Sequence, residues 1–491
     1  MLDVTRNLTM MTDFYELTMS AGYLEEDYQD KISVFDMFFR RVPDGGGYAI
    51  MAGLQQFIDA VDHLHFTPED IDYLRSTGVF NEKFLHYLEN FQFHCNIWAI
   101  KEGTPIFPHE PIVTVEGPAI ECQLVETLLL VTFNHQCLIA TKANRIVRSA
   151  AGRPVMEFGA RRAQGYDAAY FGARASYIAG CSSTSCVMAS RDFGIPASGT
   201  MAHSWVQMFP SEYDAFEKYA RLYPDNCVLL VDTYSVLKSG VPNAIKVFDQ
   251  VLAPMGKRPK GIRIDSGDIA YLSKKARAML DAAGYEDCTI CASNSLDEYI
   301  VRDLILQGAK LDSFGIGENM ITAKSDPVFG GVYKLAAVKE ADGSYTPKIK
   351  ISETAEKMTI PGLKKVWRIY DRDGKAMADY ITVYDEEVDT SNGITLFDPV
   401  ETWKEVTYIN CTAKCLSTPI YQEGKRVYDS PSLQEIREFC AQQVDTLWDE
   451  VKRFEYPHTH YVDLSQKLWD IRHNLLRSMS KRNVSIAPKS E

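Results

Sequence analysis

Three short stretches of this 491-residue chain combine residue types that could bind or transfer phosphate. Arg161 and Arg162 are adjacent, and because a guanidinium holds a carboxylate or phosphate through two parallel hydrogen bonds, the pair could clamp an anion. Asp265 and Asp268 could bind ribose hydroxyls or a Mg²⁺ ion carried by a pyrophosphate. His203 could act as a general base, or as a nucleophile that accepts a phosphoryl group.

Each of these stretches also has a purely structural interpretation. Adjacent arginines are often solvated, or form ion pairs at the start of a helix. A single histidine such as His203 is more often structural than catalytic. Asp268 could cap the helix that is expected to follow it. Residue type and spacing alone therefore leave a structural role and a functional role open at each position.

Two further features could contact a ligand. Gly315 and Gly317, followed by Gly330 and Gly331, bracket Thr322, and glycines let backbone N–H groups approach a phosphate closely, although a tight turn explains a lone Gly-x-Gly equally well. Tyr15 could stack on a heteroaromatic ring, or could be an ordinary core aromatic.

The middle of the chain predicts the element order that would gather these residues. Short apolar runs alternate with helix-like stretches about every thirty residues, which is the size of a βαβ unit. The predicted strands are 154–158, 195–197, 227–231, 261–264, 288–292 and 312–316. Polar clusters follow each strand, and the carboxyl ends of parallel strands share one side of a barrel. We therefore expect an α/β fold with a TIM-like (β/α) barrel whose strand ends build one enzyme site.

The two ends of the chain have a different pattern. Residues 1–135 mix helix-like and strand-like segments, and residues 341–491 contain strand runs, a turn at 371–374 and a helical tail at 432–454. We expect these ends to pack together as a second α+β domain, with the barrel formed by residues 136–340.

Charge and cysteine content exclude several classes of protein. The net charge of -14 and a pI near 5.3 argue against broad binding of nucleic acid or anionic membranes, which requires excess Lys and Arg. No secretory leader is visible, and the apolar run at 125–140 is too short to span a membrane. The odd count of eleven cysteines suits reduced thiols. We expect a cytoplasmic enzyme.

Several stretches together resemble the nicotinate phosphoribosyltransferase family, in the family's order and over nearly the whole chain. The resemblance implies an irregular barrel of the type II phosphoribosyltransferases, a flanking domain built from both chain ends, and a homodimer with shared sites. The segments that carry it are 12–19, 157–165, 199–204, 261–268, 331–335 and 352–362.

The resemblance also implies roles for individual residues. His203 is similar to the histidine that ATP phosphorylates, so that ATP hydrolysis drives formation of nicotinate mononucleotide from nicotinate and phosphoribosyl pyrophosphate. The expected nicotinate contacts are Tyr15, within its own subunit or across the dimer, Arg161, Thr200 and Arg263. The expected phosphoribosyl pyrophosphate contacts are Arg162, Ser204, Asp265, Gly317 and Thr322. Mg²⁺ is expected to arrive with the pyrophosphate, near Asp265 or Asp232.

Three alternatives remain at this point. A nicotinamide enzyme would share the fold, but the paired Arg161 and Arg162 favour an acid over a neutral amide. Quinolinate enzymes are much shorter. A catalytically idle relative would have no chemical reason to retain His203.

One residue departs from the family pattern: Glu318 is acidic where animal members carry a small hydroxyl residue, and it is an unusual neighbour for a phosphate.

Overall fold

The computed structural model describes residues 6–351 and 358–480, and its chain divides into two compact units. Residues 135–328 and 432–441 form the first, here called the parallel-sheet unit. The remainder, built from both ends of the chain, forms the antiparallel-sheet unit. Helix α6 (Glu126–Ser149) runs from one unit into the other, and so does α15 (Leu433–Thr446).

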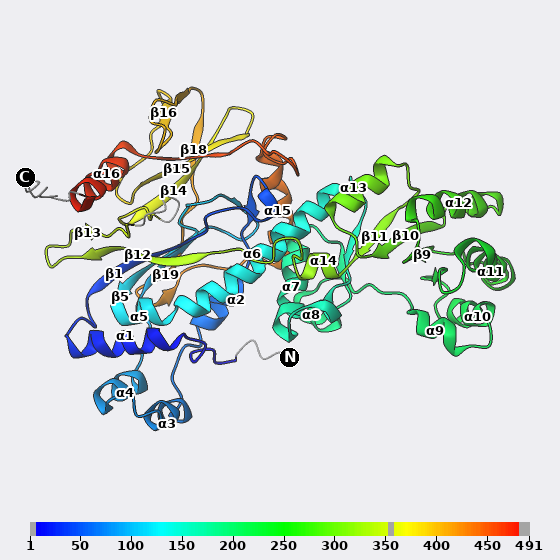
Figure 1. Ribbon diagram of the computed structural model, residues 1–491, viewed down its shortest axis with the longest axis horizontal. Coiled ribbons are helices and arrows are strands. Elements are labelled where there is room, and N and C mark those ends of the chain that lie inside the picture. The colour runs from blue at the N-terminus through cyan, green and yellow to red at the C-terminus, as the bar shows by residue number, and fades with distance from the viewer. Residues whose placement is uncertain (1–5, 352–357, 481–491) are drawn as a thin grey trace, which may run out of the picture. The chain divides into compact units, whose positions relative to one another are not determined.

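The parallel-sheet unit contains six strands in the order β7-β6-β11-β10-β9-β8, all parallel. All of these strands except the one at Ser183–Thr184 contain buried apolar residues, as expected for strands covered on both faces. In Figure 1, β9, β10 and β11 lie side by side in this unit. The strands are β6 (Val155–Glu157), β7 (Ser183–Thr184), β8 (Val228–Leu230), β9 (Gly261–Ile264), β10 (Thr289–Asn294) and β11 (Ser313–Ile316).

The expected barrel is confirmed only as a mixed α/β fold with parallel strands, because no closed barrel is present among the described residues. Strand β6 pairs with β7, and strands β8, β9, β10 and β11 pair in chain order. Strand β11 then pairs with β6, which is the circular order of a barrel. The predicted strand at 195–197 is reduced to a single bridge between Ala197 and Thr184, and no ladder joins it to β8 in the part of the chain described. Pro196 has no N–H to donate, which limits pairing here.

Helices connect these strands. Asp268 caps α12 by accepting a hydrogen bond from the Tyr271 N–H at 2.9 Å, so the capping interpretation of Asp268 is correct. The helix ends before Gly284, at φ +81°. The helices of this unit are α7 (Tyr166–Ile178), α8 (Val187–Phe193), α9 (His203–Met208), α10 (Glu212–Leu222), α11 (Val241–Val247), α12 (Ile269–Ala282), α13 (Glu298–Leu306), α14 (Glu318–Ile321) and the short 3₁₀ turn η2 (Ala160–Arg162).

The antiparallel-sheet unit has two larger sheets. A seven-stranded antiparallel sheet has the order β13-β12-β1-β5-β3-β19-β20, and a four-stranded sheet has the order β18-β14-β15-β21. The strands are β1 (Ile32–Phe38), β3 (Asn96–Ala99), β5 (Val113–Pro118), β12 (Val332–Lys339), β13 (Tyr345–Pro347), β14 (Lys364–Tyr370), β15 (Ala376–Val383), β18 (Thr412–Cys415), β19 (Thr418–Gln422), β20 (Lys425–Arg426) and β21 (Tyr461–Leu464). Two-stranded pairs join β2 (Ala49–Ile50) with β4 (Pro105–Ile106) and β16 (Ile394–Phe397) with β17 (Glu405–Tyr408).

Two predicted boundaries were wrong. Residues 332–339 were expected in the barrel, but β12 pairs with β1 over six residues in the antiparallel-sheet unit. Residues 432–441 were expected in the second domain, but they belong to the parallel-sheet unit, where the Arg437 guanidinium donates to the carbonyls of Tyr177 and Gly180 at the end of α7. The predicted helix over 432–454 ends at Thr446.

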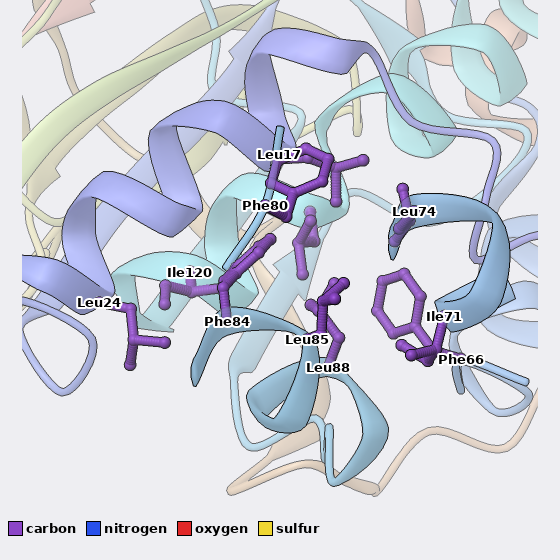
Figure 2. Close-up of a cluster of buried hydrophobic side chains, with 11 residues drawn as sticks. Leu17, Leu24, Phe66, Ile71, Leu74, Phe80, Phe84, Leu85, Leu88 and Ile120 are labelled. Atoms are coloured by element: carbon purple, nitrogen blue, oxygen red, sulfur yellow. The ribbon is translucent and has the colours of Figure 1, made fainter. Parts of the chain in front are cut away.

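An apolar cluster fixes the first helices of the antiparallel-sheet unit. Figure 2 shows Leu17 and Leu24 of α1 (Phe14–Glu25) beside Phe84 of α4 (Glu82–Glu89) and Ile120 of α5 (Ala119–Leu124). The carboxylate of buried Glu16 accepts hydrogen bonds from the hydroxyl and the N–H of Thr127, which holds α1 against the start of α6. The remaining helices here are α2 (Leu54–Val61), α3 (Pro68–Ser76) and α16 (Gln466–Ser480).

One helical stretch of the described residues, Ala119–Ser149, passes a length and composition test for crossing a membrane. Its helix extends well beyond the apolar run recognised at 125–140. Of its most apolar window, 67% is buried inside the protein, as is usual for a core helix.

Candidate active site

A cavity of about 370 Å³ opens at the carboxyl ends of the parallel strands. Every strand from β6 to β11 except β8 supplies at least one lining residue from its end or from the loop that follows. The lining includes seven residues singled out from the sequence, namely Arg161, Arg162, Thr200, His203, Arg263, Asp265 and Gly317. The predicted convergence of separate polar clusters is therefore what the fold produces.

Three arginines give this cavity its positive charge. Arg161 and Arg162 stand on η2, directly after β6, and both are exposed to solvent. Arg263 lies within β9, where its guanidinium donates to the Thr200 hydroxyl while its Nε atom is buried without a partner. A buried donor without an acceptor is costly, and an anionic ligand in the cavity would satisfy it.

His203 begins helix α9 and faces two carboxylates. Its Nδ1 lies 3.2 Å from the Thr233 hydroxyl, while Nε2 lies 3.8 Å from Asp265 Oδ2 and 4.0 Å from Asp232 Oδ1. The side chain is 40% exposed, so a substrate can reach it. A carboxylate beside one ring nitrogen favours the proton there and leaves the other nitrogen with its lone pair.

Asp232 joins the ends of β8 and β9. Its Oδ2 accepts from the Asp265 N–H at 3.0 Å and from the Ser266 hydroxyl at 2.6 Å, while its buried Oδ1 has no partner. Ser293 in turn donates to Asp265. Asp232 is not itself in the cavity lining, but it fixes the backbone of Asp265, which is.

The carboxylates at this site suit a metal that arrives with its own ligands. Among the described residues, no group of three or more His, Cys, Asp or Glu side chains is arranged to hold a metal ion. Mg²⁺ commonly uses only one or two protein carboxylates and takes its other ligands from phosphate and water. The unpartnered Oδ1 of Asp232 and the carboxylate of Asp265 fit that pattern.

Local packing sets the shape of the cavity floor. Buried Glu157 accepts from the Thr184 hydroxyl at 2.6 Å and from the Gly159 N–H, which ties β6 to β7, and burial raises the pKa of its carboxyl. Phe158 follows directly and lines the cavity. A side chain at Gly317 would lie 2.8 Å from the Phe158 carbonyl oxygen, so only glycine fits this turn.

Comparison with known proteins decides the family. Residues 10–134 match the nicotinate phosphoribosyltransferase N-terminal domain, residues 154–371 match the nicotinate phosphoribosyltransferase family, and residues 363–472 match its C-terminal domain. The nicotinate phosphoribosyltransferase of Bacillus subtilis is 43% identical over 479 residues, which cover 97% of this chain and 96% of that protein. The chain belongs to the nicotinate phosphoribosyltransferase family.

Solved structures agree with this membership. The crystal structure of human nicotinic acid phosphoribosyltransferase superposes with a TM-score of 0.82 at 28% identity, covering 96% of this chain and all of the human one. A nicotinate-nucleotide pyrophosphorylase from Pyrococcus furiosus gives a TM-score of 0.69 at 21% identity over 90% of this chain and 96% of the other, and so shares the fold. As a member of this family, the chain is an enzyme.

Some residues assigned through the nicotinate phosphoribosyltransferase resemblance lie outside the cavity lining. Ser204 is exposed on α9, and the Thr322 hydroxyl donates to the Glu318 carbonyl at 2.8 Å, at the end of α14. Tyr15 belongs to the other unit, where it is 44% exposed, and both burial and the nearby Glu126 carboxylate raise its pKa. Most of the family segment at 352–362 lies outside the described residues.

Phe158 and Asn294 line the cavity but were not selected from the sequence as binding residues. Phe158 had a visible signal, because an aromatic residue directly precedes the Gly159–Arg162 cluster at a strand end. Asn294 has a positive φ of 119°, a strained conformation that clusters at functional sites and that no sequence pattern reveals.

Proposed function

We propose that this cavity joins nicotinate to phosphoribosyl pyrophosphate, forming nicotinate mononucleotide and pyrophosphate in NAD biosynthesis. The observation that carries the proposal is the convergence of three arginines and His203 on one cavity in a member of this family. The pyridine nitrogen attacks the anomeric carbon as the bond from that carbon to the pyrophosphate oxygen breaks. Because the ring nitrogen already has a lone pair, no general base is needed for this step.

Nicotinate would be recognised by stacking of its ring on an aromatic side chain and by binding of its carboxylate to arginines. Phe158 is the aromatic residue in the cavity lining, and its ring offers a face on which a pyridine can stack. Arg161 and Arg263 would bind the carboxylate, with Arg263 already oriented by Thr200. Tyr15 would close the site from a second subunit of a homodimer.

Phosphoribosyl pyrophosphate would occupy the other half of the cavity. Arg162 binds phosphate, Asp265 meets the ribose hydroxyls, and the backbone at Gly317 lets a phosphate approach closely. Ser204 and Thr322 would complete the contacts, with the Thr322 hydroxyl turning from the Glu318 carbonyl to the phosphate. When bound with the substrate, Mg²⁺ supplies positive charge to the leaving pyrophosphate, held on the protein side by Asp265 or Asp232.

His203 would link this reaction to ATP. The carboxylates of Asp232 and Asp265 hold the proton on Nε2, and Nδ1 attacks the γ-phosphorus of ATP once the Thr233 hydroxyl has turned away from its lone pair. A nitrogen–phosphorus bond forms, the bond to the ADP oxygen breaks, and ADP leaves. Water later cleaves the phosphohistidine to inorganic phosphate, so that ATP hydrolysis favours nucleotide formation.

The location, the assembly and the barrel type belong to the same proposal. We place the enzyme in the cytoplasm, as a homodimer with shared sites. The open parallel sheet would be an irregular form of the type II phosphoribosyltransferase barrel, interrupted between Ala197 and β8.

The test is product formation by wild type and His203→Ala with nicotinate or nicotinamide, each with and without Mg-ATP. We expect turnover of nicotinate that ATP stimulates, with the stimulation lost in His203→Ala while ATP-independent turnover remains. His458→Ala, which changes an exposed histidine of the other unit, is the matched control. A preference for nicotinamide would overturn the substrate assignment, and unchanged ATP stimulation in His203→Ala would overturn the role of the histidine. An inactive wild type would indicate an idle relative.

A further inference from the structure

Glu318 is an acidic residue in the lining of a cavity proposed to bind a highly charged anion. It begins α14, directly after Gly317. Its carboxylate lies 2.8 Å from Lys324 Nζ and 4.0 Å from Arg162 Nε. Lys324 is 61% exposed and Arg162 59% exposed, so the carboxylate lies between two cations that solvent and ligands can reach.

At this corner of the cavity one carboxylate offsets part of the charge of two cations. The Lys324 ammonium, and to a smaller extent Arg162, lower the pKa of the Glu318 carboxyl, so it is ionised at neutral pH. A permanent carboxylate beside Arg162 repels a phosphate that approaches the same guanidinium. A phosphate site optimised for affinity alone would not place an acid here.

We propose that Glu318 is a placeholder anion, which offsets part of the positive charge of Lys324 and Arg162 and is displaced from them by a phosphate group of the substrate. The inference rests on the proposed function and adds a residue that sets how tightly the site holds phosphate. Displacement lets the two cations transfer to the ligand, and the returning carboxylate competes with pyrophosphate when the reaction is complete. Glu318 thereby weakens binding and accelerates product release.

The geometry permits such an exchange. Ion pairs between exposed side chains contribute little free energy, and a phosphate with two or more charges competes well for the same cations. Only the side chain needs to move, because the Glu318 carbonyl is held separately by the Thr322 N–H at 3.1 Å. The backbone of α14 can therefore remain in place while the carboxylate swings away.

The experiment compares wild type with Glu318→Gln, by calorimetric titration with pyrophosphate and with phosphoribosyl pyrophosphate, each with Mg²⁺ and with EDTA. Removing one negative charge near the ligand is expected to tighten binding of both about threefold to tenfold, and to slow pyrophosphate release in stopped-flow displacement. Added salt should reduce the difference, since the effect is electrostatic. Glu217→Gln breaks another ion pair, between the partly exposed Glu217 and Arg221 at 2.8 Å, and should leave both affinities unchanged.

Unchanged or weaker binding by Glu318→Gln, in a variant with the thermal stability of wild type, would overturn the proposal. Weakening confined to the Mg²⁺ titrations would assign Glu318 to the metal instead. Failure of the wild type to bind phosphoribosyl pyrophosphate would be a different result, since it would overturn the proposed function before the variant is compared.

Discussion

At the scale of single residues, Asp232 has a carboxylate whose two oxygens differ in their hydrogen bonding. One carboxylate oxygen accepts two hydrogen bonds, and the other is buried without a partner, 4.0 Å from His203. Such an oxygen is explained if it orients the histidine electrostatically. We expect Asp232→Asn to reduce ATP-dependent phosphorylation of the protein by about a hundredfold or more, measured with γ-labelled ATP, because the charge that fixes the imidazole proton is lost.

The control for Asp232→Asn is Ser266→Ala, which removes a hydrogen bond from an uncharged donor to the same carboxylate but keeps the charge of the carboxylate. Loss of one such bond should change phosphorylation less than about tenfold. Equal losses in the two variants would show that the carboxylate acts only by positioning the loop. ATP-independent nucleotide formation should survive in both.

The sequence predicted most of the cavity because polar residues that directly follow strands must meet where parallel strands end. Arg161, Asp265 and His203 could all be located in this way. The partnerless oxygen of Asp232 and the strained backbone of Asn294 could not, since both arise from contacts between residues distant in the chain. The placement of Thr322, with its hydroxyl turned to a helix carbonyl, also depends on geometry that motifs do not encode.

At the scale of elements, the turn from β11 into α14 has room for glycine alone. Gly317 has φ -121° and ψ -94°, and an added Cβ would lie 2.8 Å from the Phe158 carbonyl oxygen and 3.4 Å from Gly159 Cα. Backbone atoms cannot move aside as a side chain can. We expect Gly317→Ala to displace α14 from η2, raise KM for phosphoribosyl pyrophosphate at least tenfold and lower stability by about 1–3 kcal/mol.

Steady-state kinetics and thermal melts would check the Gly317→Ala prediction. Gly22→Ala is the matched control, because this helical glycine has no atom within 4 Å of an added Cβ, and alanine should stabilise its helix by about 0.5–1 kcal/mol. A Gly317→Ala enzyme with the wild-type KM would show that the loop tolerates displacement and that the phosphate is bound elsewhere.

Element positions were predictable in proportion to their length and pattern. The run at 261–264 matches β9 residue for residue, since its apolar residues lie between clear turn signals. The two-residue strand β7 was missed because Ser183 and Thr184 have no apolar pattern. Strand 195–197 was overestimated because Pro196 interrupts its hydrogen bonding, which is also why the sheet is open at this point.

At the scale of the whole molecule, the alternation of pattern along the chain predicted two units, but not their exact membership. Strand β12 continues directly from the last loops of the parallel-sheet unit, so its sequence position suggested the barrel, whereas its pairing with β1 is set by partners about 300 residues away. Residues 432–441 similarly return to the parallel-sheet unit through contacts of Arg437 that no local pattern signals.

The stability of the antiparallel-sheet unit should fall as pH rises through neutrality. Burial, reinforced by the Asp398 carboxylate, raises the pKa of Asp463 to about 7 from an ordinary value of 3.8. Between these values the folded state binds a proton that the unfolded chain has released. The stabilisation is therefore fully present below about pH 4 and is lost as pH rises through 7.

Asp463→Asn keeps the shape of the side chain and removes its titration. We expect the variant to match wild type near pH 4 and to exceed its unfolding free energy by about 1 kcal/mol at pH 8, because the wild type then holds a charged carboxylate in a largely buried position. Thermal melts at closely spaced pH values would measure the difference.

Asp385→Asn is the control with the opposite sign. Lys467 lowers the pKa of exposed Asp385, so loss of the Asp385 charge should slightly destabilise the protein above pH 4. Parallel pH curves for wild type and Asp463→Asn would show that Asp463 is already ionised in the folded protein at low pH.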